Sequence, residues 1–165
     1  MADLSPEQWR VLNHLYQHKL HTVRPKLAHV RQSQHVTDAD LLDLDEMYLI
    51  GATIAGRDVS VSAIRNLAKH ARLRLTGPGL RYMSADPFNQ MRYTLSRHAQ
   101  PITLRRLFTD NTITHDDVEA AARDRQITVT IAEDFPHDFG TRLAQLPATQ
   151  VRVALTSKGR EYLPR

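Results

Sequence analysis

The chain has 165 residues, of which 41% are hydrophobic and 24% are charged, a composition typical of a globular protein of one ordinary domain or two small ones. No apolar run approaches the roughly 20 residues of a membrane-spanning helix, and the first residues lack the basic-then-apolar layout of a secretory signal, so we expect a cytoplasmic protein that does not enter membranes. The absence of cysteine excludes disulfides, cysteine-ligated zinc and thiol catalysis.

Positive charge gathers in one part of the sequence. The net charge is only +4, but the stretch from Arg57 to Arg81 contains six basic residues and one acid, Asp58. This distribution is expected of a protein that binds a polyanion. A solvated basic face has the same composition, so both interpretations stay open.

The first predicted helix runs from about Pro6 to Leu20. Ser5 is a good N-cap, Pro6 suits the first helical position, and Gln8 completes an S-x-x-Q capping box. The side chains expected on its apolar face are Trp9, Leu12, Leu15, Tyr16 and Leu20.

Three histidines, His14, His18 and His21, fall on the opposite face of this helix, near Glu7 and Arg10. A solvent-facing polar stripe, a divalent metal site and a pH-sensitive contact surface are three interpretations of this face. The solvent-facing stripe is favoured, because a metal needs ligands oriented by further hydrogen bonds that the sequence does not reveal.

Two further helices are predicted next. The first spans Val23–Gln34, with Pro25 near its start. The second spans Asp40–Ala55 and is capped by Thr37 and Asp38. Its acidic front suits the partial positive charge of a helix N-terminus.

After a break at Gly56, a helix is predicted from about residue 60 to residue 71. Ala52 and Gly56 are four residues apart, and Ile64 and Leu67 are three apart, spacings that resemble a helix-turn-helix. The gap between the two pairs is two residues longer than in the usual motif, so the turn is expected to be extended.

The outward face of this helix contains candidate DNA contacts. Arg65, Lys69 and Arg72 line up on it, with Ser62 and Asn66 beside them. Such a face sets Arg or Asn against base edges and the remaining side chains against phosphates. Many helices with a basic outside are only solvated, and that alternative stays open.

The polar link Ser84–Pro87 predicts a boundary between a first domain, 1–85, and a second domain, 86–165. The elements predicted in the second domain are helices Pro87–His98, Ile102–Phe108 and Thr114–Arg125, strands Ile127–Ala132 and Gln150–Leu155, and a loop from Glu133 to Thr149.

One phrase occurs twice. Residues 75–83 (LTGPGLRYM) recur as residues 155–163 (LTSKGREYL), and a short basic and apolar strand precedes each copy. We expect the Thr to end the strand and cap the next turn, and the Gly to relieve the backbone where the chain reverses. The repeat predicts two units of similar plan.

The phrase resembles the end of a winged-helix domain, where the last wing strand finishes in L-T and a T-x-x-G turn starts a closing helix. The resemblance implies a mainly α fold with small β-hairpins, in two winged-helix-like domains in tandem. Residues 86–163 match the winged-helix order of three helices, hairpin and closing phrase. The first half departs from it, because a helix over 60–71 leaves residues 73–76 as the only strand and no room for a two-stranded wing.

The resemblance implies a double-stranded DNA-binding protein, either a transcriptional regulator or a plasmid or phage maintenance factor. A homodimer is expected because symmetric pairing doubles the contacts of one recognition helix. The acidic third helix of the second domain is expected to pack or to contact a protein partner. The predicted DNA contacts are Arg57, Ser62, Arg65, Asn66, Lys69, Arg72, Arg74, Arg105, Arg106, Arg142 and Arg152.

Signatures of phosphate loops, dinucleotide sites, zinc proteases and hydrolases are absent, so we expect no enzyme activity, cofactor or metal. His115-Asp116-Asp117 suggests metal-dependent phosphoester cleavage, but acids in a first helical turn more simply complement the helix dipole. Two alternatives stay open: a winged-helix scaffold that binds protein without DNA, and a metal-dependent enzyme in which His14, His18 and His21 meet carboxylates.

Overall fold

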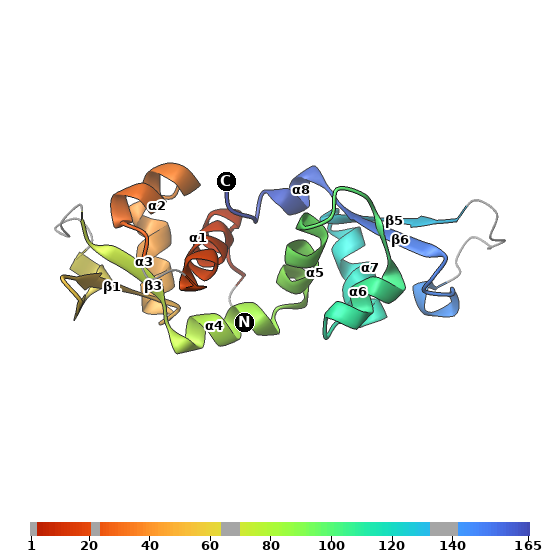
Figure 1. The fold of residues 1–165 in the computed structure, drawn as a ribbon, viewed down its shortest axis with the longest axis horizontal. Coiled ribbons are helices and arrows are strands. Elements are labelled where there is room, and N and C mark those ends of the chain that lie inside the picture. The colour runs from red at the N-terminus through yellow and green to blue at the C-terminus, as the bar shows by residue number, and fades with distance from the viewer. Residues whose placement is uncertain (1–2, 21–23, 64–69, 133–141) are drawn as a thin grey trace. The chain divides into compact units, whose positions relative to one another are not determined.

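The computed structural model describes residues 3–20, 24–63, 70–132 and 142–165. The chain divides into two compact units (Figure 1): unit 1 comprises residues 1–85 with 161–165, and unit 2 comprises residues 86–160. Both units are mainly helical with one small antiparallel sheet, which confirms the predicted class of mainly α structure with small β-hairpins. In the described part of the chain, no helix is both long and apolar enough to cross a membrane.

Unit 1 contains a three-stranded sheet in the order β2-β1-β3. Its elements are α1 (Pro6–Gln17), the 3-10 helix η1 (His18–Leu20), α2 (Leu27–Gln34), α3 (Asp38–Glu46), β1 (Ile50–Ile54), β2 (Arg57–Val59), the 3-10 helix η2 (Val61–Ala63), β3 (Arg72–Leu75) and α4 (Gly77–Ala85).

Unit 2 contains a three-stranded sheet in the order β4-β6-β5. Its elements are α5 (Pro87–Ser96), β4 (Ile102–Thr103), α6 (Leu104–Asp110), α7 (His115–Arg123), β5 (Ile127–Ile131), the 3-10 helix η3 (Leu143–Gln145), β6 (Val151–Leu155) and α8 (Ser157–Arg160). The predicted helices and strands of this half are confirmed, except that Ile102 and Thr103 pair with β6 instead of starting a helix.

The predicted helix Asp40–Ala55 is wrong in its second half. The α3 helix ends at Glu46, and Ile50–Ile54 forms β1, the central strand of the sheet. Ala52 lies on this strand, and Gly56, with a φ of 77°, turns the chain into β2. The helix-turn-helix spacing of Ala52 and Gly56 therefore has no structural counterpart.

The structure describes only the two ends of the predicted helix 60–71, and neither is α-helical. Val61–Ala63 forms a 3-10 helix, and Arg72 belongs to β3. Because β1 pairs with both β2 and β3, the prediction that residues 73–76 form the only strand is wrong. Outside the described residues lie the predicted contacts Arg65, Asn66 and Lys69 and the predicted core positions Ile64 and Leu67.

The two units repeat one order of elements. Each begins with a helix and continues with a short strand contact, two helices and an antiparallel strand pair, β1 with β3 or β5 with β6; each ends with a helix that starts in the L-T-x-x-G phrase, and unit 1 has β2 in addition. The short strand contacts correspond in register: Lys26 pairs with Arg72 in unit 1, and Thr103 pairs with Arg152 in unit 2. The element order thus agrees with the predicted repeat.

The third helix of each unit begins in the same way. The hydroxyl of Thr37 accepts from the backbone N–H of Asp40 at 3.3 Å, and the Asp40 carboxylate accepts from the N–H of Thr37 at 2.9 Å. Thr114 and Asp117 form the same capping box at the start of α7. Both boxes satisfy N–H groups that have no partner inside the helix.

Each third helix also ends in the same way. Tyr48 (φ 57°) follows α3 and Arg125 (φ 61°) follows α7, both in the left-handed conformation that often ends a helix. The hydroxyl of Thr76 donates to the Tyr48 carbonyl, and that of Thr156 donates to the Arg125 carbonyl at 2.6 Å. The repeated threonine therefore ties the end of the third helix to the end of the last strand.

The repeated glycine allows the closing helix to approach this point. A Cβ atom at Gly79 would lie 2.1 Å from the carbonyl oxygen of Leu49, and one at Gly159 would lie 2.2 Å from that of Gln126. The N–H groups of Gly79 and Gly159 donate to the threonine hydroxyls at 3.0 and 3.1 Å. The expected role of Thr as a cap is confirmed, but Gly is required by close approach to a backbone, and not by chain reversal.

Replacing Gly79 by Ala is expected to destabilise unit 1 by about 1–3 kcal/mol or more, because the Leu49 backbone must move away from the new methyl group. Urea unfolding followed by the fluorescence of Trp9, the single tryptophan of the chain, measures this loss. The matched control is Gly77→Ala, whose Cβ would meet only Arg81 Nη1, at 3.6 Å. Equal stability of the two variants would contradict the close-approach argument.

Candidate nucleic-acid interface

The outer face of the unit 1 sheet contains three cationic side chains. In β3, Leu73 is buried in the core, whereas Arg72 and Arg74 project to the other face. Lys26 pairs directly with Arg72, so its side chain lies on the same face. We call Lys26, Arg72 and Arg74 the cationic sheet face.

The neighbouring strand makes room for one of these arginines. Gly51 pairs with Arg74, and a Cβ atom at Gly51 would lie 3.3 Å from Arg74 Cζ, so the guanidinium lies over the glycine. Arg74 Nη2 lies 3.2 Å from a carboxylate oxygen of Asp58, whose side chain is 74% exposed. An exposed pair of this kind contributes little to stability, so the Arg74 charge is only loosely engaged.

Within the part of the chain that the structure describes, the other two cations have no such partner. Arg72 donates through Nη1 to the backbone carbonyl of Arg24, a neutral acceptor. Within the described residues, neither Arg72 nor Lys26 forms an ion pair with an acidic side chain, and none of the α3 acids meets them. The sheet face therefore has excess positive charge available for a phosphate.

The third helices have the opposite charge. The α3 helix contains five acids and no Lys or Arg, and α7 contains three acids and one arginine, Arg123. Asp38 pairs with Arg31 at 2.8 Å, and Asp40 is used as a cap. Phosphates would repel both helices, so neither is suited to lie in a DNA groove.

The remaining predicted contacts are distributed over several elements of both units. Arg57 pairs with Ile54, on the face of the sheet opposite to Arg72 and Arg74. Ser62 is exposed in η2. The predicted unit 2 contacts are all exposed: Arg105 and Arg106 on α6, Arg142 before η3, and Arg152 on β6. Lys26 is not among the predicted contacts, although its register with Arg72 matches that of Thr103 with Arg152.

No protein-family model matches this chain, and no curated protein matches it significantly. The chemistry of the two units is therefore inferred from their own residues.

The polar face of α1, expected to face solvent, is buried. Arg10 is 2% exposed and donates to the backbone carbonyls of Gln34 at 3.2 Å and Glu161 at 2.7 Å. Asn13 donates to the Tyr162 carbonyl at 3.3 Å. The interpretation as a solvent-facing stripe is wrong, because residues 161–165 and α2 cover this face.

The described histidines of this face are not part of a group that could hold a metal ion. The His14 ring is 7% exposed and lies 4.7 Å from the His18 ring and 5.9 Å from the His29 ring, measured between centroids. Among the described residues, no three metal-binding side chains come together. His21 lies outside the described residues. Burial, with smaller contributions from His18 and His29, lowers the His14 pKa from 6.5 to about 4.

The neutral state of His14 is expected to make unit 1 sensitive to acid. The unfolded chain takes up this proton near pH 6.5 and the folded unit only near pH 4, so the stabilisation is complete above pH 6.5 and is lost as the pH falls towards 4. The loss amounts to up to about 3 kcal/mol. Trp9 fluorescence in urea at several pH values should show it in the native sequence and not in His14→Gln. His98→Gln, in unit 2, should retain it, and a His14→Gln variant with the native pH profile would exclude this role.

Proposed function

We propose that this protein binds double-stranded DNA as a tandem winged-helix protein, and that the cationic sheet face of unit 1 makes the main contact. The observation that supports the proposal most directly is the placement of Lys26, Arg72 and Arg74 on one outer face of a sheet, with two of these charges unpaired among the described residues. Arginines on alternate strand positions project to the same side, so each can reach a phosphate oxygen.

The order of elements supports the winged-helix part of the proposal. In both units a short strand contact separates the first helix from the second, and paired strands follow the third. The antiparallel pair of β1 and β3 then corresponds to the wing of unit 1, with β2 as an additional strand. Contact through the wing and the strand face agrees with an acidic third helix, since phosphates repel that helix and are attracted by the sheet.

A homodimer would present two such faces and double the number of phosphate contacts. Regulation of transcription, or maintenance of a plasmid or phage, is the role that such binding would serve in the cytoplasm. Arg65, Asn66 and Lys69 lie outside the described residues, and with Ser62 they stay predicted DNA contacts within this proposal.

A second candidate function is a winged-helix scaffold that binds protein without DNA. The charge of the third helices favours it, because α3 contains five acids and no Lys or Arg to neutralise them. A basic protein surface would complement such a helix. In this case the protein shows no affinity for duplex DNA even at low salt.

The two functions are separated by fluorescence anisotropy with a random-sequence duplex at about 50 and about 200 mM salt. We expect the affinity of the native protein to fall steeply between them. The double variant Lys26→Gln with Arg72→Gln should bind more weakly, and its slope of log affinity against log salt should be smaller by about 2, because each of the two cations neutralises one phosphate in the native complex.

The matched control is Arg97→Gln with Arg123→Gln, which removes two exposed charges of unit 2 that are not among the predicted contacts and should change the slope little. A third variant, Arg65→Gln with Lys69→Gln, tests the contacts predicted outside the described residues. An affinity that does not depend on salt, or a larger loss in the unit 2 control, would contradict the proposed interface.

A further inference from the structure

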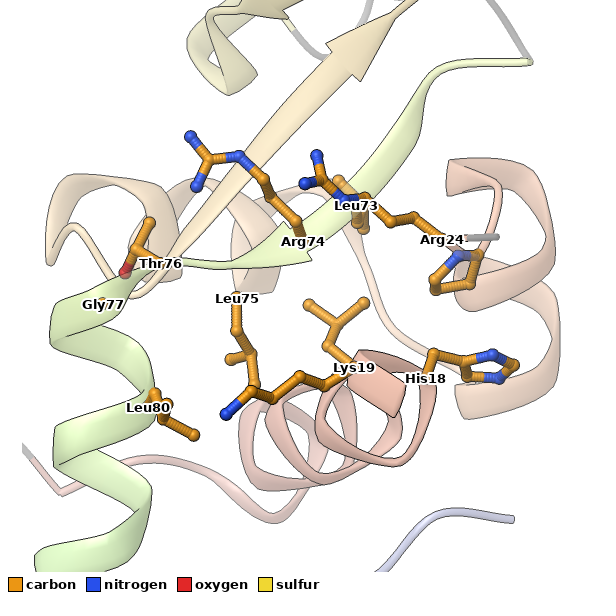
Figure 2. A pocket seen from close by; sticks show the side chains of 11 residues that line it. His18, Lys19, Arg24, Leu73, Arg74, Leu75, Thr76, Gly77 and Leu80 are labelled. Atoms are coloured by element: carbon orange, nitrogen blue, oxygen red, sulfur yellow. The ribbon is translucent and has the colours of Figure 1, made fainter. Parts of the chain in front are cut away.

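Unit 1 contains a pocket of about 230 Å³ between the end of α1, the residues before α2, β3 and the start of α4 (Figure 2). This volume is below the range of about 300–1,000 Å³ that suits drug-sized ligands, so a smaller molecule fits it. The lining residues are Leu15, His18, Lys19, Arg24, Pro25, Leu73, Arg74, Leu75, Thr76, Gly77 and Leu80.

Apolar side chains from separate elements form the base of the pocket. Leu15 of α1 and Leu73 of β3 are almost completely buried, and Pro25, just before α2, is buried as well. Leu75 and Leu80 are partly exposed and close one side. A ligand therefore needs an apolar body to replace water on this surface.

Two exposed cations are among the lining residues. Lys19 and Arg24 are exposed and, within the described residues, neither forms an ion pair with an acidic side chain. Figure 2 shows the Lys19 side chain extending towards Leu75 and Leu80, and the Arg24 side chain extending towards β3. The ammonium thus lies beside Leu75 and Leu80, and the guanidinium lies at β3 near Leu73.

The rest of the lining does not neutralise these charges. No Asp or Glu is among the eleven lining residues. The Arg74 guanidinium is directed away, towards Asp58 and over Gly51, so Arg74 lines the pocket without supplying its free charge. The Thr76 hydroxyl is already engaged by Tyr48 and by the N–H of Gly79. Positive charge above an apolar base is complementary to an organic anion.

We infer that this pocket binds a small organic anion with one acidic group and one apolar body, of the size of a short aryl or alkyl carboxylate. Lys19 and Arg24 hold the carboxylate by charge-assisted hydrogen bonds, and the leucines contact the apolar body. An inorganic anion has no apolar body, so it would not displace water from the apolar base of the pocket. An uncharged analogue would not pair with Lys19 or Arg24. The inference does not depend on DNA binding, because neither Lys19 nor Arg24 belongs to the cationic sheet face.

The test uses phenylacetate as the probe and follows the amide signals of the full chain by ¹H–¹⁵N NMR. We expect saturable shifts in residues 73–80, with a Kd on the order of 1 mM or tighter. Phenylacetamide has the same shape without the charge, and inorganic phosphate has charge without the apolar body. Both should bind at least about tenfold more weakly.

The double variant Lys19→Gln with Arg24→Gln should weaken phenylacetate binding by about tenfold or more. The matched control is Lys26→Gln, which removes an exposed cation of the same segment that does not line the pocket. The spectra also show whether each variant is folded. The inference is overturned by absent or unsaturable shifts in residues 73–80, by equal binding of phenylacetamide, or by a folded double variant with native affinity.

Discussion

The contact of Thr76 and Gly79 with the backbone after α3, repeated by Thr156 and Gly159 after α7, is the constraint on which each unit depends. The hydroxyl satisfies a carbonyl that the helix leaves without a partner. The missing side chain lets the closing helix rest on the same backbone. The strand before the threonine is thereby fixed in register against its neighbour, and a one-residue slip would turn every side chain to the other face.

This register decides which side chains reach the outer face of each sheet. The pairing of the last strand is the same in the two units, but the charges differ. In unit 1 the strand places Arg72 and Arg74 outward, and the paired Lys26 adds a third cation. The three equivalent positions of unit 2 include only one cation. The two units therefore share an order of elements but differ in the charge of this sheet face. The corresponding residues of unit 2 are Thr103, Arg152 and Ala154.

The sequence is sufficient to predict the repeat and unit 2, because the strands of that unit alternate clearly and its third helix has an evident cap. In unit 1 the first two predicted helices are present, but the prediction fails after α3, where Met47, Ile50 and Ile54 continue its helical spacing. The helix ends at Glu46, and Tyr48 just after it adopts the left-handed conformation although it is neither glycine nor asparagine. Because of that spacing, the predicted helix includes the residues of β1. The sequence therefore predicts neither this strand nor the outer sheet face that forms the candidate interface.

The buried polar face of α1 is beyond prediction for a different reason. Its cover lies far away in the sequence: the Glu161 carbonyl accepts from Arg10, the Tyr162 carbonyl accepts from Asn13, and the Arg165 N–H donates to Gln34. Helical periodicity reports the neighbours of a residue along the helix and not what packs over it. Since residues 161–165 belong to unit 1, unit 2 is an insertion within unit 1 and not a separate second half. The hydrogen bonds from the polar side chains of α1 to residues 161–165 therefore hold the end of the chain in unit 1, after the inserted unit 2.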